Sequence, residues 1–201
     1  MQSAKAAANT LCNPETQVSA QYLIAEDGEV IALVPEAERA WHAGAGQWGE
    51  ITDVNSRSIG IELANTGFTP FAAAQMDALT SLLQGIMTRW AIRPERVIGH
   101  SDMAPGRKID PGVRFDWRRL ALEGLSVWPS VGAEVKVVDP ASFATAMQSC
   151  GYRATDDPDL LLSVFRLRFR PRHKGPLDAL DIAMIQDLAH RFPVDASDTA
   201  T

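Results

Sequence analysis

Residues that could do chemistry gather in one short stretch, residues 97–112, which reads V-I-G-H-S-D-M-A-P-G-R-K-I-D-P-G. It holds His100 and Asp110, whose imidazole and carboxylate suit zinc, and a catalytic zinc needs three protein ligands plus an open position for water. Lys108 lies two residues before Asp110, so the two side chains share a side if the segment is extended. A cation there could stabilise charge that develops on a substrate oxygen. The alternative interpretation is a polar surface loop that contains one histidine.

A second candidate is Glu62, which lies in the segment S-I-G-I-E-L-A at residues 58–64. Hydrophobic residues alternate with the others along this segment, a pattern that predicts a β-strand with two distinct faces. The face opposite the hydrophobic one carries small residues except for Glu62. The carboxylate would therefore project into open space with room for a ligand beside it. The alternative is an ordinary glutamate on the solvent side of an amphipathic strand.

Several elements are predicted to position these residues. Residues 2–12 are alanine-rich and predict a helix with Ser3 as its N-cap. Apolar runs at 22–24 and 30–34 flank E-D-G and predict a β-hairpin. Val97 and Ile98 predict a strand that delivers the rigid loop carrying His100.

A long helix is predicted to follow Thr69-Pro70, which fits an N-cap and a first-turn proline. Its apolar residues keep the spacing of a helix packed on a sheet, and we assign Met87 and Trp90 of that stripe to the core. Pro94 ends this segment. Residues 115–125 predict a short closing helix.

Residues 40–57 form a long glycine-rich loop that carries Trp41, His42 and Trp48. Long loops that stay ordered tend to be functional. Two tryptophans beside a histidine could line a groove for sugar or peptide. Equally, they could fix the loop onto the core.

The pattern changes after residues 126–133, which resemble a linker. Helices are predicted at about 139–151, 158–169 and 177–192, a small three-helix bundle without a catalytic constellation. Positive charge is concentrated over residues 166–174, which include four arginines, His173 and Lys174. This cluster is interpreted either as a solvated helix end or as a contact for an anionic polymer. His173 and His190 are predicted to be surface residues.

Composition describes an ordinary globular chain of 201 residues, 46% hydrophobic and 22% charged. Nineteen Lys and Arg face 25 Asp and Glu, and a net charge of −6 argues against a nucleic-acid partner. No apolar run approaches the length of a membrane span, and residues 1–9 contain no apolar core of a signal peptide. Cys12 and Cys150 make no disulfide framework, and both are predicted to be buried.

Five stretches occur in a fixed order along the chain. They are V-S-A-Q-Y-L-I (18–24), the E-D-G turn, A-W-H-A-G (40–44), N-S-R-S-I-G-I-E (55–62) and G-H-S-D-M-A-P-G-R-K-I-D-P-G (99–112). Together they resemble the zinc N-acetylmuramoyl-L-alanine amidases of the type-2 amidase family. The segments L-L-S-V-F-R-L-R-F-R-P (161–171) and G-P-L-D (175–178) resemble the C-terminal peptidoglycan-binding domain of its AmiD-like members.

Pattern and resemblance together predict an α/β fold with a mixed central sheet flanked by helices, followed by a small C-terminal three-helix bundle. The resemblance implies an amidase domain over residues 1–128, incomplete at its N-terminus. It also implies a peptidoglycan-binding-like helical domain over residues 135–194.

The family's site residues carry over only to positions that match. The resemblance implies Zn²⁺ as cofactor, with His100 and Asp110 as two of three ligands. It implies that Glu62 is the catalytic acid/base and Lys108 the residue that stabilises the transition state; Trp41, His42 and Arg57 are expected to bind substrate. Zinc would lower the pKa of a water molecule, and Glu62 would pass that proton to the departing amine. The bond cut would join N-acetylmuramic acid to the L-alanine of the stem peptide.

The family's remaining zinc ligand is a histidine in an N-terminal strand, and residues 1–4 align after that block. His42 is a possible replacement, although the family carries a histidine there as well. A second departure is Gln21, where many relatives have histidine, and it is expected to alter contacts in the groove.

Three explanations of the absent ligand compete. The start codon could be misassigned in front of a longer, active protein. The chain could be a peptidoglycan binder that no longer hydrolyses its ligand, which is the main alternative function. It could also be a defective fragment without a role.

The expected partners are peptidoglycan and muropeptides, with no nucleic acid and no transmembrane segment, and the chain is expected to be a monomer. Two-domain relatives act in the cell envelope, which implies the periplasm. Since no signal peptide is visible, the cytoplasm is the alternative compartment.

Overall fold

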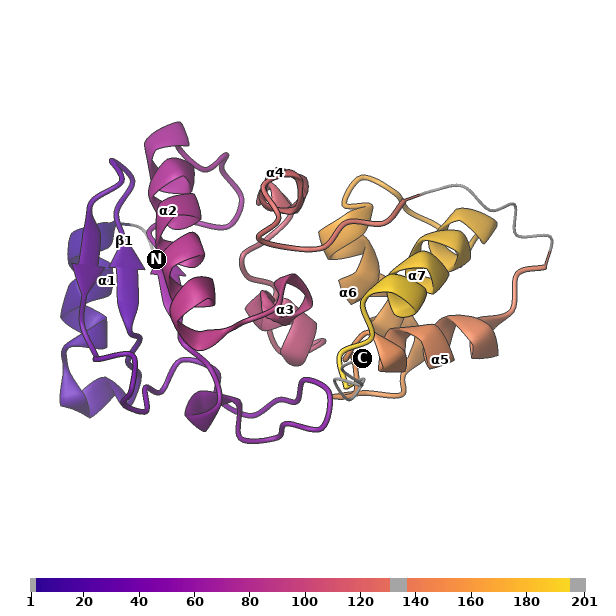
Figure 1. The fold of residues 1–201 in the computed structure, drawn as a ribbon, viewed down its shortest axis with the longest axis horizontal. Coiled ribbons are helices and arrows are strands. Elements are labelled where there is room, and N and C mark those ends of the chain that lie inside the picture. Colours follow the sequence, from indigo (N-terminus) through magenta and orange to yellow (C-terminus); the bar gives the residue numbers. More distant parts are fainter. Residues whose placement is uncertain (1–2, 131–136, 196–201) are drawn as a thin grey trace. The chain divides into compact units, whose positions relative to one another are not determined.

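The computed structural model describes residues 3–130 and 137–195 (Figure 1). The chain divides into two compact units, each assembled from separate stretches of sequence. Unit 1 comprises residues 1–46, 52–92 and 111–115, and unit 2 comprises residues 47–51, 93–110 and 116–201. Unit 1 contains Glu62, whereas unit 2 contains His100, Lys108 and Asp110.

Unit 1 is built on a three-stranded sheet in the order β2-β1-β3. The central strand β1 (Tyr22–Ile24) pairs antiparallel with β2 (Val30–Ala32) and parallel with β3 (Ile61–Leu63). In this register Leu23 lies opposite Ile31 on one side and opposite Glu62 on the other. The sheet is therefore mixed, as predicted.

The predicted hairpin joins β1 to β2. Gly28 in its turn has φ +93°, and a Cβ there would lie 2.7 Å from the carbonyl oxygen of Ala74. Both the positive φ and this close approach require glycine at that position.

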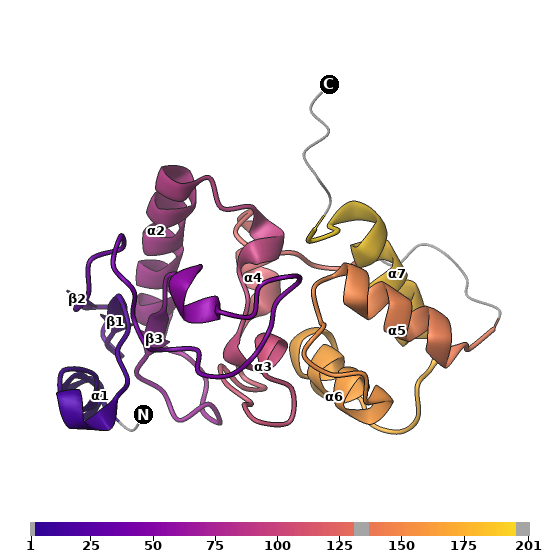
Figure 2. The same ribbon diagram turned by 90° about the horizontal axis from the view of Figure 1, so that it is seen from below.

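Two helices cover the sheet of unit 1. Helix α1 (Ala4–Leu11) begins as predicted, with the Ser3 hydroxyl accepting a hydrogen bond from the backbone N–H of Ala6 at 3.3 Å. Helix α2 (Ala73–Trp90) lies on the opposite side of β1 from α1 (Figures 1 and 2). The Gln75 amide of α2 donates to the carbonyl oxygens of Ile24 at 3.0 Å and Ala64 at 3.2 Å. It thereby satisfies the backbone where β1 and β3 end.

Two expectations about α2 are wrong. The helix begins at Ala73 after Ala72, without a side-chain cap, whereas the Thr69 hydroxyl bonds to Thr66 and Asn65 in the preceding turn. Those local bonds compete with capping of the helix. Trp90 is not core, because its ring is 49% exposed and its indole N–H donates to Glu36 at 2.6 Å.

The predicted strand at Val97 and Ile98 is also wrong. A 3₁₀ turn, η3 (Pro94–Arg96), precedes it, and helix α3 (His100–Met103) follows within two residues. Val97 has extended dihedral angles, but its carbonyl accepts a hydrogen bond from the Arg168 guanidinium at 3.0 Å instead of from a strand. The residues that follow are therefore held on a turn of helix and not on a strand end.

Unit 2 contains the predicted C-terminal helices, α5 (Pro140–Ser149), α6 (Pro158–Phe169) and α7 (Ala179–Arg191), which lie together in Figure 2. Each begins at an aspartate cap, and edge-on contacts between phenylalanines join α5 to α6. Helix α4 (Trp117–Leu122) confirms the predicted closing helix. Short 3₁₀ turns, η1 (Pro14–Thr16) and η2 (Val54–Ser56), complete the described elements.

The predicted linker does not behave as a free connection where the structure describes it. Ser126, Val127 and Pro129 are buried within unit 2, and residues 131–133 lie outside the described residues. Because the compact units group residues 93–110 with the C-terminal helices, the division at residues 128–135 stays a prediction.

The cysteines are unpaired thiols with different surroundings. Cys150 is buried as predicted, and burial raises its pKa to about 12. Cys12 is exposed, so its predicted burial is wrong. None of the described helices is long and apolar enough to cross a membrane.

Candidate functional site

The two predicted metal ligands of unit 2 face each other. Nδ1 of His100 lies 3.0 Å from Oδ2 of Asp110, and the backbone N–H of Ser101 donates to the Asp110 carbonyl at 3.0 Å. Burial opposes ionisation of Asp110, but the hydrogen bond from His100 is the largest of several interactions that outweigh it, so the pKa of Asp110 lies below its ordinary value. The loop thus returns onto the first turn of α3 and brings the His100 imidazole and the Asp110 carboxylate together.

The other ring nitrogen of His100 faces Arg107, whose Nη2 lies 3.4 Å from Nε2. A guanidinium can only donate, so in the neutral form of the ring this contact makes Nε2 the acceptor and places the proton on Nδ1. The proton on Nδ1 therefore points at the Asp110 carboxylate. A metal ion bound by both side chains would replace that proton. Arg107 lies in the predicted loop but belongs to none of the predicted site residues.

The His100–Asp110 pair fits two corners of a zinc site. Two ligands about 2.0–2.1 Å from one tetrahedral ion lie roughly 3.3 Å apart, close to the separation seen here. Within residues 3–130 and 137–195, however, no group of three or more His, Cys, Asp and Glu side chains could hold a metal. Among the described residues the candidate ligands therefore number two, and His42 does not join them in a group of three.

Lys108 lies on the same loop. Its backbone N–H and that of Arg107 both donate to the Ala104 carbonyl at 3.1 Å, which closes the chain into a turn after α3. Gly106 permits this turn with φ +75°. Lys108 lies between Arg107 and Asp110 in the sequence of the loop, and the Lys108 side chain is half-buried.

In unit 1, Glu62 lies at the centre of β3 and is half-buried. Gly60 precedes it by two residues, so both lie on one face of the chain. A Cβ at Gly60 would lie 2.4 Å from the ring of His42, which shows that the imidazole rests directly on this backbone. His42 is therefore a neighbour of the strand face that carries Glu62.

The Asn55 side chain holds the loop in front of this face. Its Oδ1 accepts hydrogen bonds from the backbone N–H groups of His42 at 3.0 Å and Ala43 at 2.8 Å. Arg57 is exposed two residues later, at the end of η2. Unit 1 therefore brings Glu62 and His42 to one strand face, with Arg57 on the loop that leads to it.

The two tryptophans of the loop differ in exposure. Trp48 belongs to unit 2, where it is buried with its ring edge-on to Tyr152 at 4.9 Å. Trp41 is 55% exposed in unit 1, with the Arg39 guanidinium 4.7 Å from its ring centre. Trp48 thus belongs to the core of unit 2, whereas Trp41 lies at the surface of unit 1.

Gln21 is a structural residue of unit 1. It is fully buried, donates to the Glu38 carbonyl at 2.9 Å and accepts from the Gly60 N–H at 2.7 Å. Its expected effect on groove contacts stays a prediction. Gln21 supports β3 beneath His42.

The arginines of the predicted basic cluster are mostly internal. Arg166 and Arg168 are 7% and 4% exposed and form ion pairs with Asp181 and Asp102. Arg170 also pairs with Asp181 at 2.6 Å. Neither a solvated helix end nor an anionic-polymer contact describes these three side chains. The exposed residues of the cluster are 171–174, which include His173 as predicted.

Residues 1–113 match the family described as N-acetylmuramoyl-L-alanine amidase. The chain belongs to this family. The predicted family and its enzyme class, a hydrolase of amide bonds, are therefore confirmed.

Individual amidases extend the similarity beyond the matched residues. N-acetylmuramoyl-L-alanine amidase AmiD of Escherichia coli K12 is 36% identical over 214 residues, covering 90% of this chain and 77% of AmiD. 1,6-Anhydro-N-acetylmuramyl-L-alanine amidase AmpD of Enterobacter cloacae is 45% identical over 103 residues, which cover 51% of this chain and 55% of AmpD.

Solved amidase structures share the fold. A complex of E. coli AmiD with anhydro-N-acetylmuramic acid-L-Ala-D-gamma-Glu-L-Lys has a TM-score of 0.85 and 34% identity, covering 94% of this chain and 84% of that one. AmpDh3 of Pseudomonas aeruginosa has a TM-score of 0.82 and 29% identity, covering 94% of this chain and 87% of that one. The predicted α/β fold with a mixed sheet is thereby confirmed.

Proposed function

We propose that this amidase hydrolyses the bond between N-acetylmuramic acid and the L-alanine of peptidoglycan stem peptides, with Zn²⁺ as its cofactor. The observation that carries the proposal is the His100–Asp110 pair at 3.0 Å on its matching motif. The similarity to AmiD over 90% of the chain supports the choice of substrate.

The residues of the chain divide the chemistry between them. Zinc, when held by His100 and Asp110, supplies a water molecule whose pKa is lowered toward neutrality. Glu62 accepts the proton of the attacking water and passes it to the departing amide nitrogen. Lys108 stabilises the negative charge that develops on the carbonyl oxygen. One water is consumed, and a free carboxylate and a free amine result.

Muropeptides are the proposed substrate class, because the related AmiD structure contains an anhydro-muramyl tripeptide. Trp41, His42 and Arg57 are the proposed contacts. The exposed indole of Trp41 offers a flat apolar surface to a sugar or peptide, and Arg57 offers a cation to a stem-peptide carboxylate. We also propose the cell envelope as the compartment of action and a monomer as the functional form.

The decisive experiment uses the purified chain with anhydro-muramyl tripeptide, with and without a zinc chelator. Released tripeptide is measured by mass spectrometry and bound zinc by elemental analysis. We expect release that the chelator abolishes and added zinc restores. A zinc-loaded chain that releases no peptide would overturn the proposal.

A second candidate is a peptidoglycan-binding protein without catalysis. The observation that favours it is the two-ligand set, since the described residues contain no group of three metal-binding side chains. Incubation with purified cell-wall sacculi distinguishes the two candidates. Retention on sacculi without release of stem peptides would support the binder, whereas release would support the amidase.

A further inference from the structure

A buried carboxylate lies two residues after the proposed ligand His100. Asp102 is 1% exposed, and its oxygens accept hydrogen bonds from the Gly99 N–H at 2.8 Å, the Tyr152 hydroxyl at 2.7 Å and the Arg168 guanidinium at 2.6 Å. Burial and the neighbouring Asp102 raise the pKa of Tyr152 well above its ordinary value, so its hydroxyl keeps the proton that it donates. Asp102 thereby fixes the backbone on both sides of His100.

Arg168 is the partner that reaches furthest around this segment. It extends from α6 and donates through Nη2 to the Val97 carbonyl and to the Ser126 hydroxyl, both at 3.0 Å. Its guanidinium carbon lies 4.0 Å from the centre of the Trp117 ring. Arg168 therefore contacts the chain before His100 through Val97 and after it through Asp102.

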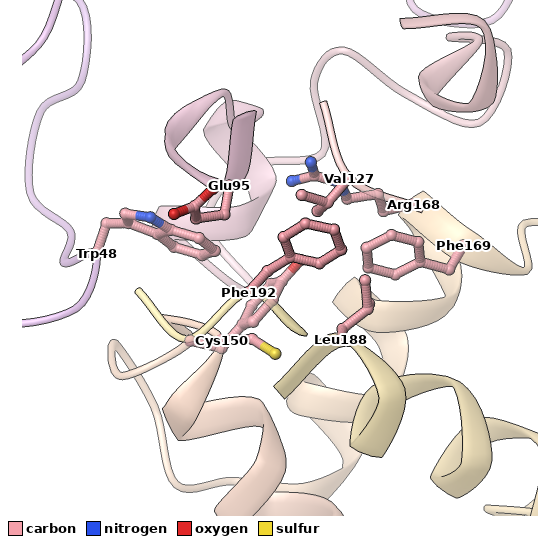
Figure 3. A pocket seen from close by; sticks show the side chains of 9 residues that line it. Trp48, Glu95, Val127, Cys150, Arg168, Phe169, Leu188 and Phe192 are labelled. Atoms are coloured by element: carbon pink, nitrogen blue, oxygen red, sulfur yellow. The ribbon is translucent and has the colours of Figure 1, made fainter. Parts of the chain in front are cut away.

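The space beside Arg168 is too small for a substrate. Figure 3 shows Arg168 near Val127 and Phe169, with Glu95 and Trp48 further along the same cavity. The centre of a water molecule can occupy only about 10 Å³ of it, so the cavity has room for about one water molecule. Arg168 is therefore not placed to bind a ligand in this cavity.

A buried ion pair is a poor way to gain stability alone, because removing two charges from water costs as much as their attraction returns. The ion pair instead fixes the orientation of the groups around it, since a guanidinium donates along fixed directions to several acceptors at once. At Arg168 those acceptors are the carbonyl and the carboxylate that bracket His100.

We propose that Arg168 and Tyr152 are positioning residues that hold His100 in its metal-binding orientation through Asp102. The C-terminal helical segment thus contributes to the hydrolytic site itself. This inference rests on the proposed function, because it takes His100 as a zinc ligand.

A matched residue on the same helix separates positioning from stability. Arg166 is also buried, pairs with the fully buried Asp181, and donates to the carbonyls of Gly175 at 2.5 Å and Pro176 at 2.7 Å. These contacts hold the segment before α7. Arg166→Lys therefore disturbs an equivalent ion pair that does not involve residues 97–102.

The experiment compares Arg168→Lys, Tyr152→Phe and Arg166→Lys in the full chain, at a temperature where near-ultraviolet circular dichroism shows each to be folded. Lysine keeps the charge but lacks the several fixed donors of arginine. Three quantities are measured: zinc affinity by chelator competition, kcat and KM on anhydro-muramyl tripeptide, and the metal-free ¹H–¹⁵N imidazole signals of His100. His100→Gln assigns those signals.

We expect Arg168→Lys to weaken zinc binding about 10–100-fold, as changes to groups that orient metal ligands commonly do. Its kcat should fall about tenfold with KM nearly unchanged, and the His100 signals should shift. Tyr152→Phe should act in the same direction but more weakly, and Arg166→Lys should change none of the three.

Equal losses in Arg168→Lys and Arg166→Lys would overturn the inference, as would unchanged zinc affinity and His100 signals in folded Arg168→Lys. If the unaltered chain neither binds zinc nor releases peptide, the proposed function fails. The His100 signals of the metal-free variants would still decide the positioning role.

Discussion

Glu62 is the residue on which the proposed chemistry depends most directly. Replacing it by glutamine keeps the size and removes the proton acceptor. We expect Glu62→Gln to lower kcat by about 10²–10⁴-fold while bound zinc is retained, because general base catalysis typically contributes that much. Steady-state kinetics and elemental analysis measure both. Glu29→Gln, an exposed residue of the hairpin, is the matched control and should retain full activity.

Trp41 tests the proposed substrate contact. Trp41→Ala should raise KM roughly tenfold with little change in kcat, because a stacking contact binds substrate and transition state alike. The ring is 55% exposed, so the midpoint of thermal unfolding should hardly move. Leu122→Ala removes an apolar side chain that is 80% exposed and serves as control. A fall in kcat alone would argue that Trp41 acts in the chemical step instead.

Sequence motifs singled out Glu62, His100, Lys108 and Asp110 as candidates, because each lies within a recognisable local pattern. They did not identify Asp102 or Arg168, whose partnership spans 66 residues and exists only in the folded chain. A signal was nevertheless present. Arg168 falls on the apolar stripe of α6, three residues after Phe165, where a charge requires a buried partner.

At the scale of secondary-structure elements, those with a recognisable turn or capping residue were predicted from the sequence. The hairpin has its E-D-G turn, α1 has Ser3, and the C-terminal helices have aspartate caps. Val97 and Ile98 were misassigned because two β-branched residues favour a strand but do not supply a neighbour to pair with. In the fold, the Arg168 side chain of α6 donates the hydrogen bond that a neighbouring strand would otherwise supply to Val97.

The contacts of Glu36 with α2 and with Tyr22 of the hairpin should stabilise the fold in a pH-dependent way. The Glu36 carboxylate accepts hydrogen bonds from Arg89, Tyr22 and Trp90, and the Arg89 bond chiefly lowers its pKa from 4.5 to about 2. A lowered pKa stabilises the fold above the unfolded value and loses that contribution as pH falls toward the folded value. The window is therefore about pH 4.5 down to 2.

Within that window the free energy of unfolding should fall by on the order of 2 kcal/mol, reduced from the full shift because the Arg89 side chain is half exposed. Glu36→Gln should be less stable at pH 7 and should lose less on acidification. Urea unfolding at several pH values measures both. Parallel pH profiles for the two proteins would contradict the assignment to Glu36.

At the scale of the whole molecule, the proposed ligands His100 and Asp110 share a compact unit with α5, α6 and α7. A chain cut after residue 130 would leave Asp102 without Arg168 and Tyr152. We expect that shortened chain to lose zinc affinity and the near-ultraviolet signal of packed tryptophans, since an unpaired buried charge is strongly destabilising. An active, folded fragment would instead support an independent amidase domain over residues 1–128.

The bond from the Gly99 N–H to Asp102 also has a consequence for slow fluctuations of the chain. An amide held by a buried carboxylate exchanges its hydrogen with solvent only when that carboxylate is released. Arg168 donates to the same Asp102 oxygen, so we expect Gly99 to exchange with the same opening free energy as the amides in the last turn of α6. A backbone proton beside the proposed zinc ligand thus reports on the unfolding of helix α6, whose Arg168 lies 66 residues after Asp102.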